Sequence, residues 1–357
     1  MRRRIGMLII SLIGIIALSA ILVLSRKEFG RVAKEERLER IRKSTSFVDE
    51  HFRNEVPTRL FTGKENRLKM TWKALASRSD DRSVPQEGEV PVVHTDLKNL
   101  PAEGDLYVWF GHSSFLLRLS GLNILVDPVF HKASPFSFIN RAFKGTAIYK
   151  PQDMPERIDY LVISHDHWDH LDYQTVTELR DRVRKVVVPL GIGESFEYWG
   201  YPAEKIIEMD WRETCEADDS LTIHCLPTRH FTGRGLWNPK TIPASWLLET
   251  PQRKVFYTGD GGYSGRFRHY GEQFPDIDLA IMENGQYNEN WSQIHTLPRQ
   301  LGLEVKELKA RRFVTVHHSK FKLSNHPWDE PRRNEQQAAR DYNLKLITAK
   351  IGEVIKL

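Results

Sequence analysis

Short apolar runs separated by glycine and polar positions dominate the chain from residue 105 onward. Runs at 106–110, 114–119 and 122–126, punctuated by Gly111 and Gly121, predict a meander of β-strands. The same pattern predicts later strands at 159–163, 185–189, 205–209, 221–226, 245–249, 254–257, 279–282 and 313–316. Segments with helical spacing alternate with these strands at 173–183, 193–199, 265–274, 297–310 and 330–342. This order predicts an α/β fold, an αββα sandwich of two mixed β-sheets with helices outside.

The N-terminal segment has a different pattern. Ile5 to Ser25 is 21 residues without a charge, between Arg4 and Arg26. At about 1.5 Å per residue, a helix of this length spans the roughly 30 Å hydrocarbon core of a bilayer. A cleaved signal peptide has a shorter apolar region of about 7–15 residues. The segment therefore predicts an uncleaved, single-pass N-terminal transmembrane helix.

The chain divides into three parts on this basis. Residues 1–26 form the predicted anchor, and 27–104 form a basic stalk followed by an extended segment that wraps the body. Within the stalk, residues 31–43 predict a charged helix, whereas 45–104 contain four prolines and few periodic runs. Residues 105–357 form the predicted folded body of the protein.

Charge is concentrated near the predicted anchor. The net charge is +5, but residues 2–4 and 26–43 alone contain 11 Lys/Arg and four Asp/Glu, which leaves 41 basic and 43 acidic residues elsewhere. A nearly neutral body argues against nucleic acid as a partner. A basic stretch beside an apolar segment favours anionic lipid headgroups, so the predicted partner is a phospholipid membrane. Basic residues flank the segment on both sides, and the side of the membrane on which the domain lies stays open.

The chemistry of the chain centres on one loop. The run 159–163 is followed by an H-x-H-x-D-H array that contains His165, His167, Asp169 and His170. Imidazole nitrogens and carboxylate oxygens are the ligands that zinc prefers when sulfur is absent. A turn at the end of a strand can direct several of them at one point, which predicts a metal site.

Three more candidate ligands each follow an apolar run: His230, Asp260 and His317. We expect His165, His167 and His230 to hold one ion and Asp169, His170 and His317 to hold another, with Asp260 bridging them. Two ions about 3.5–4 Å apart can share a hydroxide and stabilise an in-line displacement at phosphorus. In this hypothesis Asp169 and Asp260 are catalytic because they hold the ions around the nucleophile.

These motifs resemble the metallo-β-lactamase fold and, within it, the N-acylphosphatidylethanolamine-hydrolysing phospholipase D group and its bacterial relatives. The resemblance extends from about residue 52 to 357. The matching segments are 109–114, 126–130, 133–135, 163–173, 188–191, 208–211, 258–263, 274–280 and the region of His317. All seven candidate ligands match. Two segments depart from the family pattern, 283–287 and 318–320, and both are expected near the pocket.

The resemblance implies a zinc-dependent phosphoric diester hydrolase with two Zn²⁺ ions per chain. It would cleave N-acylphosphatidylethanolamine into phosphatidic acid and N-acylethanolamine. Trp168 matches a position that lies against the phospholipid, and His295 matches a histidine near its phosphate. Asp127 could accept a ligand imidazole N–H and fix its tautomer, whereas His112 either lines the site or is an ordinary core histidine. Lys320 could help to hold a phosphate, but an ordinary surface lysine is the expected role.

Other functions remain open from the sequence. One alternative is another hydrolase on the same fold, a lactonase or a phosphodiesterase for soluble substrates, because a fold does not fix a function. A second is a membrane-bound scaffold without activity, which the complete ligand set argues against. A homodimer is a further candidate assembly.

Overall fold

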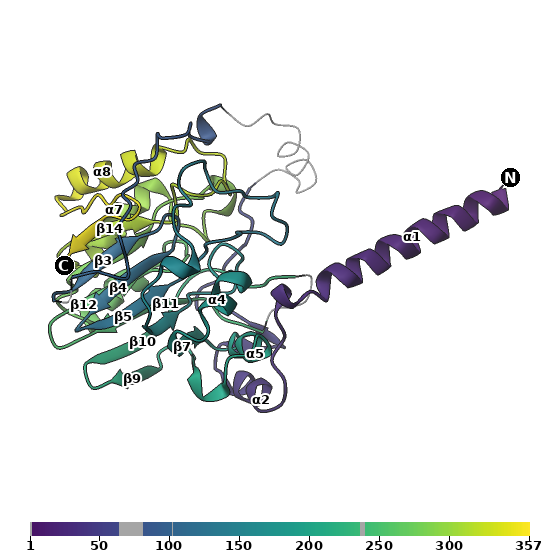
Figure 1. Ribbon diagram of the computed structural model, residues 1–357, viewed down its shortest axis with the longest axis horizontal. Helices are drawn as coiled ribbons and strands as arrows, with labels where there is room; N and C mark the ends of the chain where they lie inside the picture. The colour runs from purple at the N-terminus through teal and green to yellow at the C-terminus, as the bar shows by residue number, and fades with distance from the viewer. Residues whose placement is uncertain (1, 64–80, 102, 236–239) are drawn as a thin grey trace.

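Two β-sheets packed face to face form the body of the protein in a computed structural model (Figure 1). The structure describes residues 2–63, 81–101, 103–235 and 240–357, without the side chains of residues 2–10, 17 and 81. Helices lie on the outer faces of both sheets, as the alternation of strands and helices predicted.

The first sheet has seven strands in the order β15-β3-β4-β5-β6-β7-β8. Its strands β3 to β5 form the predicted antiparallel meander, and β5 to β8 are parallel. Their bounds are β3 Leu106–Trp109, β4 Phe115–Leu119, β5 Leu122–Val126, β6 Ile158–Val162, β7 Val183–Pro189, β8 Ile206–Met209 and β15 Val354–Lys356. The helices α4 (Tyr173–Leu179) and α5 (Gly193–Tyr198) pack on its outer face.

The second sheet has six strands in the order β14-β13-β12-β11-β10-β9. Strands β9 to β12 are antiparallel, and β12 to β14 are parallel. Their bounds are β9 Thr214–Asp218, β10 Leu221–Pro227, β11 Ala244–Glu249, β12 Lys254–Tyr257, β13 Leu279–Glu283 and β14 Phe313–Val316. Its outer face is covered by α6 (Arg266–Gln273), α7 (Pro298–Leu308) and α8 (Glu330–Tyr342).

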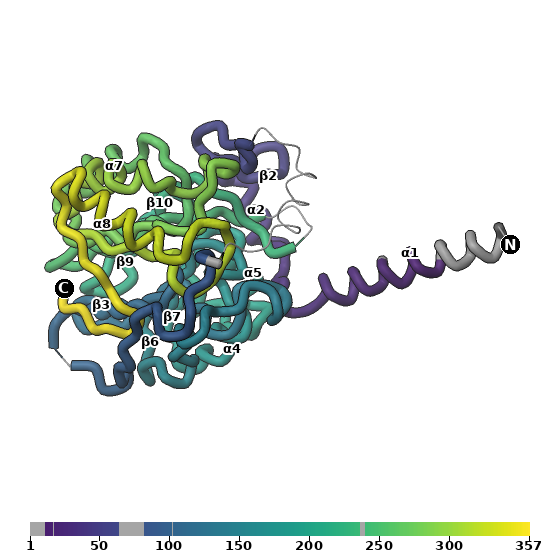
Figure 2. The backbone as a smooth tube through the Cα atoms, turned by 90° about the horizontal axis from the view of Figure 1, so that it is seen from above, coloured from purple at the N-terminus to yellow at the C-terminus, as the bar shows by residue number. Residues whose placement is uncertain are grey.

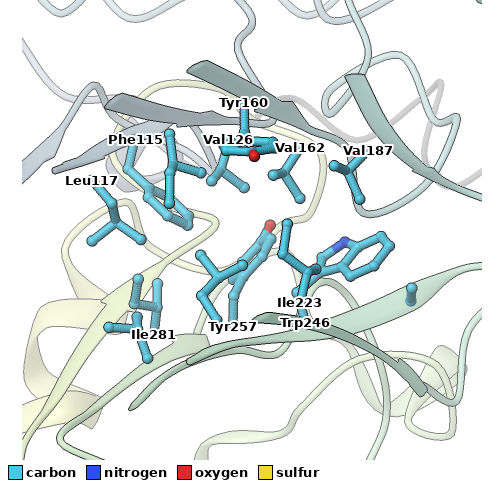
Figure 3. Packing of buried hydrophobic residues seen from close by; sticks show 14 of the residues in the cluster. Phe115, Leu117, Val126, Tyr160, Val162, Val187, Ile223, Trp246, Tyr257 and Ile281 are labelled. Atoms are coloured by element: carbon cyan, nitrogen blue, oxygen red, sulfur yellow. The ribbon is translucent and has the colours of Figure 1, made fainter. Parts of the chain in front are cut away.

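The main core lies between the sheets (Figure 3). Successive side chains of a strand point to opposite faces, so Phe115 and Leu117 of β4 face the second sheet while Leu116 packs under the outer helices. Tyr257 and Trp246 fill the space from the other side. The sheets are thereby held at a fixed spacing, and the loops at their shared edge are held with them.

Some predicted boundaries were wrong. The helix predicted at 173–183 ends at Leu179, because β7 already begins at Val183 and pairs with β6. Strands β9 and β15 were not predicted: β9 is a polar edge strand, and β15 closes the first sheet from the far end of the chain. A short hairpin, β1 (Phe47–Val48) and β2 (His51–Phe52), was also missed.

The N-terminal region begins with α1 (Arg2–Leu24), which extends away from the body beside α5 (Figure 1, Figure 2). The charged helix α2 (Glu35–Lys43) is shorter than the predicted 31–43. Across the described part of the chain, no helix is both long and apolar enough to cross a membrane. The membrane anchor stays a prediction.

Candidate metal centre

The histidine loop connects β6 to α4 and is fixed by a buried carboxylate on the neighbouring strand. Asp127 follows β5, which is parallel to β6, so both strands end at the same edge of the sheet. Asp127 Oδ1 accepts a hydrogen bond from Ser164 N at 2.7 Å, and Oδ2 accepts one from Ser164 Oγ at 2.5 Å. Asp172 fixes the other end of the loop by accepting hydrogen bonds from Thr175 Oγ1 and from His131 N at 3.0 Å. The loop is therefore anchored at both ends.

The first group of ligands is the tri-histidine cluster, His165, His167 and His230. His167 Nδ1 lies 2.9 Å from His165 Nε2 and 3.2 Å from His230 Nε2. His230 follows β10, and its Nδ1 is 2.7 Å from the carbonyl oxygen of Ile294, to which it donates. Burial lowers the pKa of all three imidazoles, because the charged form is poorly solvated there. Neutral imidazoles keep the lone pairs that metal binding requires.

The second group is the mixed cluster, Asp169, His170 and His317. Asp169 Oδ2 is 3.6 Å from His170 Nε2 and 3.3 Å from His317 Nε2. His170 Nδ1 donates to Asp127 Oδ2 at 2.8 Å, which leaves Nε2 facing the cluster. This is the hydrogen bond that we expected Asp127 to accept from a ligand imidazole.

Asp260 lies between the two clusters, at the end of the loop that follows β12. Its Oδ1 is 3.3 Å from His170 Nε2, and its Oδ2 is 3.2 Å from His317 Nε2. The same Oδ2 is 3.8 Å from His230 Nε2 and 4.0 Å from His165 Nε2. The structure thus brings all seven predicted residues together and gives Asp260 the central position.

The electrostatics of the mixed cluster fit a bound cation. Burial alone would raise the pKa of Asp260, but His170 and His317 hold it well below its usual range. Burial would lower the pKa of His170 and His317, yet the carboxylates Asp260 and Asp169 raise both, that of His317 to about 10. His170 Nε2 is buried and has no hydrogen-bond partner among the described residues. Two carboxylates, one buried and one partly buried, beside two imidazoles are a donor set that suits divalent metals.

His112 lines the centre, which the sequence left undecided. Its Nε2 donates to Asp169 Oδ2 at 2.9 Å, and burial lowers the pKa of the imidazole to about 3. His112, Asp127 and His317 all have positive φ angles, of 51°, 41° and 72°. Left-handed backbone is unfavourable for such residues and persists where surrounding contacts enforce it, often at functional sites.

Glu283 is a further residue that the sequence analysis did not single out as part of the site. It ends β13 and is buried, and its Oε1 accepts a hydrogen bond from His295 Nδ1. The other oxygen, Oε2, accepts from Gly261 N at 2.9 Å. The signal was the one used for Asp260 and His317, a polar residue where an apolar strand ends. His295 itself lies 3.9 Å from Asp260 Oδ2, at the edge of the clusters.

A pocket of about 310 Å³ opens onto the clusters. His167, Asp169, Asp260, His295 and His317 form its polar wall. The remaining lining residues are mostly apolar: Leu60, Phe231, Trp291, Ile294 and Leu323, with Gln286. The segment 283–287, which departs from the family pattern, reaches the pocket through Gln286. The side-chain amide of Gln286 accepts hydrogen bonds from Leu323 N and Ser324 N, and it donates to the carbonyl oxygens of His317 and Phe321. The site thus combines a charged floor with an apolar rim.

Trp168 and Lys320 are absent from the lining of the pocket in the described structure. Trp168 packs between Phe29, at a ring distance of 5.0 Å, and the guanidinium of Arg234, at 4.0 Å. It does not line the 310 Å³ pocket in the described structure, and its contact with substrate stays a prediction. Lys320 was expected at the surface, but it is buried, and its Nζ donates to the carbonyl oxygens of Phe110 and Val129 at 3.2 and 2.9 Å. It is therefore turned into the core.

The sequence matches the family described as the beta-lactamase superfamily domain over residues 122–318. An uncharacterized protein of Mycobacterium tuberculosis is 34% identical over 294 residues, which cover 81% of this chain and 78% of that protein. The N-acyl-phosphatidylethanolamine-hydrolyzing phospholipase D 1 of Caenorhabditis elegans is 28% identical over 292 residues, covering 75% and 80%. Among solved structures, the metallo hydrolase Igni18 of Ignicoccus hospitalis superposes with a TM-score of 0.55 at 18% identity, covering 71% and 99%.

Proposed function

We propose that this chain, which belongs to the beta-lactamase superfamily, is a membrane-tethered, metal-dependent phosphodiesterase that removes the headgroup of a phospholipid. The observation that carries the proposal is the convergence of the tri-histidine and mixed clusters on Asp260. The resemblance to phospholipase D-type enzymes, inferred from the sequence motifs, agrees with the relatives found.

The residues fit two divalent cations, and zinc suits the imidazole-rich donor set best. Two ions bound here would lower the pKa of water and neutralise the charge that develops on a phosphate. In the hydrolysis, the oxygen of water bonds to phosphorus, the bond from phosphorus to the headgroup oxygen breaks, and the headgroup leaves as an alcohol after it takes up a proton. Asp260 and Asp169 would supply the negative charge that holds such cations.

Other side chains would orient the substrate. His295 faces the pocket beside Asp260 and is held by Glu283, so it is placed to contact a phosphate oxygen. Leu60 and Phe231 at the rim are 46% and 37% exposed, an apolar margin suited to acyl chains. A phospholipid has an anionic phosphate at one end and apolar acyl chains at the other. An apolar rim above a cationic centre would match both ends.

The specific substrate we propose is N-acylphosphatidylethanolamine, which would yield phosphatidic acid and N-acylethanolamine. The name of the Caenorhabditis elegans relative supports this choice. Purified full-length protein, supplied with zinc and micellar substrate, should release N-acylethanolamine, and the Asp260→Asn variant should not. If the protein opens lactones or cleaves soluble phosphodiesters but leaves the lipid intact, the alternative hydrolase function is correct.

The tether is proposed from the uncharged stretch of residues 5–25, most of which lies in α1. Full-length protein should remain with the membrane fraction after alkaline washing. An arginine at the centre of a transmembrane helix costs about 2.5–3.5 kcal/mol, so Leu12→Arg combined with Ile16→Arg should shift the protein to the supernatant. The variant Val48→Arg, in strand β1, is the matched control and should stay in the membrane fraction. Equal retention of all three proteins would contradict the tether.

A further inference from the structure

A loop near the end of α1 exposes large apolar side chains to solvent. We call residues 134–144 the tip loop. Ile139 N donates to the carbonyl oxygen of Phe136 at 3.0 Å, and Ser134 Oγ lies 2.7 and 2.6 Å from the carbonyl oxygens of Phe136 and Ile139. These contacts close a turn with Phe138 at its apex. Phe138 is 67% exposed and Ile139 is 42% exposed.

The exposed side chains are held in place. The rings of Phe138 and Phe136 stack with centroids 5.6 Å apart, and the guanidinium of Arg26 lies 5.9 Å from the Phe136 ring. Exposed apolar groups of this kind are unfavourable in water and often mark an interaction site. The turn therefore places both side chains on the solvent-facing side of the loop.

The charges that the tip loop itself carries all have one sign, and Glu87 lines the same groove as Arg141 and Lys144. From residue 131 to 145 the chain carries Lys132, Arg141 and Lys144 and no Asp or Glu. Arg141 and Lys144 are exposed, whereas Lys132 is partly buried and pairs with Glu28. Phenylalanine flanked by Lys and Arg is the composition of segments that lie in the headgroup region of anionic membranes.

The tip loop also lies between α1 and the pocket. On one side, Arg26 directly follows the uncharged segment that ends at Ser25. On the other side, Ala133 and Ala142 pack with Phe321 and Leu323, and Leu323 lines the 310 Å³ pocket. Packing contacts therefore connect the tip loop both to the residue that follows the uncharged segment and to a residue of the pocket lining.

We propose that the tip loop is a second membrane contact, which inserts Phe138 and Ile139 into the interface of an anionic phospholipid bilayer and sets the pocket against the lipid. The inference rests on the proposed function, because it assumes that α1 holds the chain at a bilayer. It adds an orientation: the tether fixes one point, and the tip loop fixes the face that meets the substrate.

The test uses full-length protein reconstituted into vesicles of phosphatidylcholine and phosphatidylglycerol in equal amounts. The variant Phe138→Cys is made with Cys215→Ser, since the remaining Cys225 is fully buried, and is labelled with a nitrobenzoxadiazole fluorophore. The label should be quenched by spin-labelled lipid and shielded from aqueous iodide. A label at Val48→Cys, which replaces a 40% exposed residue, should show the reverse. Equal behaviour of the two labels would overturn the proposal.

Hydrolysis supplies a second, independent readout. With N-acylphosphatidylethanolamine added to the same vesicles, the double variant Phe138→Ser/Ile139→Ser should cleave this lipid severalfold more slowly than the parent while cleaving a soluble phosphodiester at the same rate. Exchange of Arg141 and Lys144 for Glu should reduce label quenching on anionic vesicles more than on pure phosphatidylcholine. If the tip loop bound a protein partner and not lipid, spin-labelled lipid would not quench the label at position 138. That result would contradict the inference. If the parent protein showed no phosphodiesterase activity while lipid still quenched the label at position 138, the result would count against the proposed function alone.

Discussion

The tri-histidine cluster and the mixed cluster meet at Asp260 but differ in charge. The first offers three neutral imidazoles, whose pKa values burial lowers. The second contains Asp169 and faces the buried Asp260, and these carboxylates raise the pKa of His170 and His317. A cation at the mixed cluster therefore has to displace protons, whereas a cation at the tri-histidine cluster does not. The difference suggests that the clusters respond separately to pH and to substitution, which allows each to be tested.

The residue that joins the clusters should matter most. Asp260→Asn removes the charge shared by both, so each should lose metal affinity, and kcat/KM should fall about 1,000-fold, since metal stabilisation is worth several kcal/mol. The rate is measured on a soluble phosphodiester alongside zinc content per chain. Asp276→Asn, which alters an exposed carboxylate paired with Arg311, is the control and should be silent. Loss of only one ion in Asp260→Asn would contradict its bridging position.

Asp127 should separate the clusters. Asp127→Asn weakens the acceptor for His170 Nδ1, and losses of this kind cost about 10–100-fold in metal affinity. Zinc titration against a chromophoric chelator should show this loss mainly at the weaker-bound ion of the variant, with the tri-histidine cluster less affected. If both clusters lost zinc affinity by the same factor, Asp127 would act on the whole histidine loop through Ser164.

The pH dependence follows from the direction of the pKa shifts. His170 and His317 hold their protons above the usual imidazole range, that of His317 up to about pH 10. Metal affinity at the mixed cluster should therefore rise with pH, by about tenfold per unit for each proton displaced. The tri-histidine cluster should stay nearly constant between neutral pH and mild alkali. Calorimetric titration in two buffers of different ionisation heat counts the protons, and no release with either ion would refute the distinction.

Substitution of Glu283 should have the smallest effect on kcat/KM, and it should alter the contact with substrate and not the binding of metal. Glu283→Gln removes the charge that holds His295 Nδ1, so kcat/KM should fall by about tenfold or less while metal content stays unchanged. The pH profile of kcat/KM should also shift, which a purely structural role would not cause. If zinc is lost instead, Glu283 is a ligand of a cluster with Asp260, His295 and His317, which lie close enough together to form one.

The sequence predicted the two-sheet sandwich and the positions of the seven ligands because both depend on local pattern. Each ligand follows an apolar strand, and strand ends gather at one edge. Contacts between distant segments were not predictable in this way. The side-chain amide of Asn54 brackets the backbone of His230, donating to its carbonyl oxygen at 2.9 Å and accepting from its N–H at 3.2 Å across 176 positions.

The same limit explains the site residues that were missed or misplaced. His112 stands in an ordinary-looking strand connection, and only the packing of the loop shows that it donates to Asp169. Trp168 lies inside the histidine loop, yet Phe29 from the N-terminal region determines its contacts. Lys320 has a charged side chain, yet it points into the core, where two backbone carbonyl oxygens accept hydrogen bonds from its ammonium group.

The number of zinc ions bound per chain distinguishes two joined clusters from one. Full-length protein saturated with zinc and freed of excess ion should retain two zinc ions per chain, and a His167→Ala/His230→Ala variant should retain one, at the mixed cluster. Both proteins are measured by elemental analysis against protein concentration from amino-acid analysis. A parent protein that retains no more zinc than the variant would contradict the account of two clusters joined by Asp260.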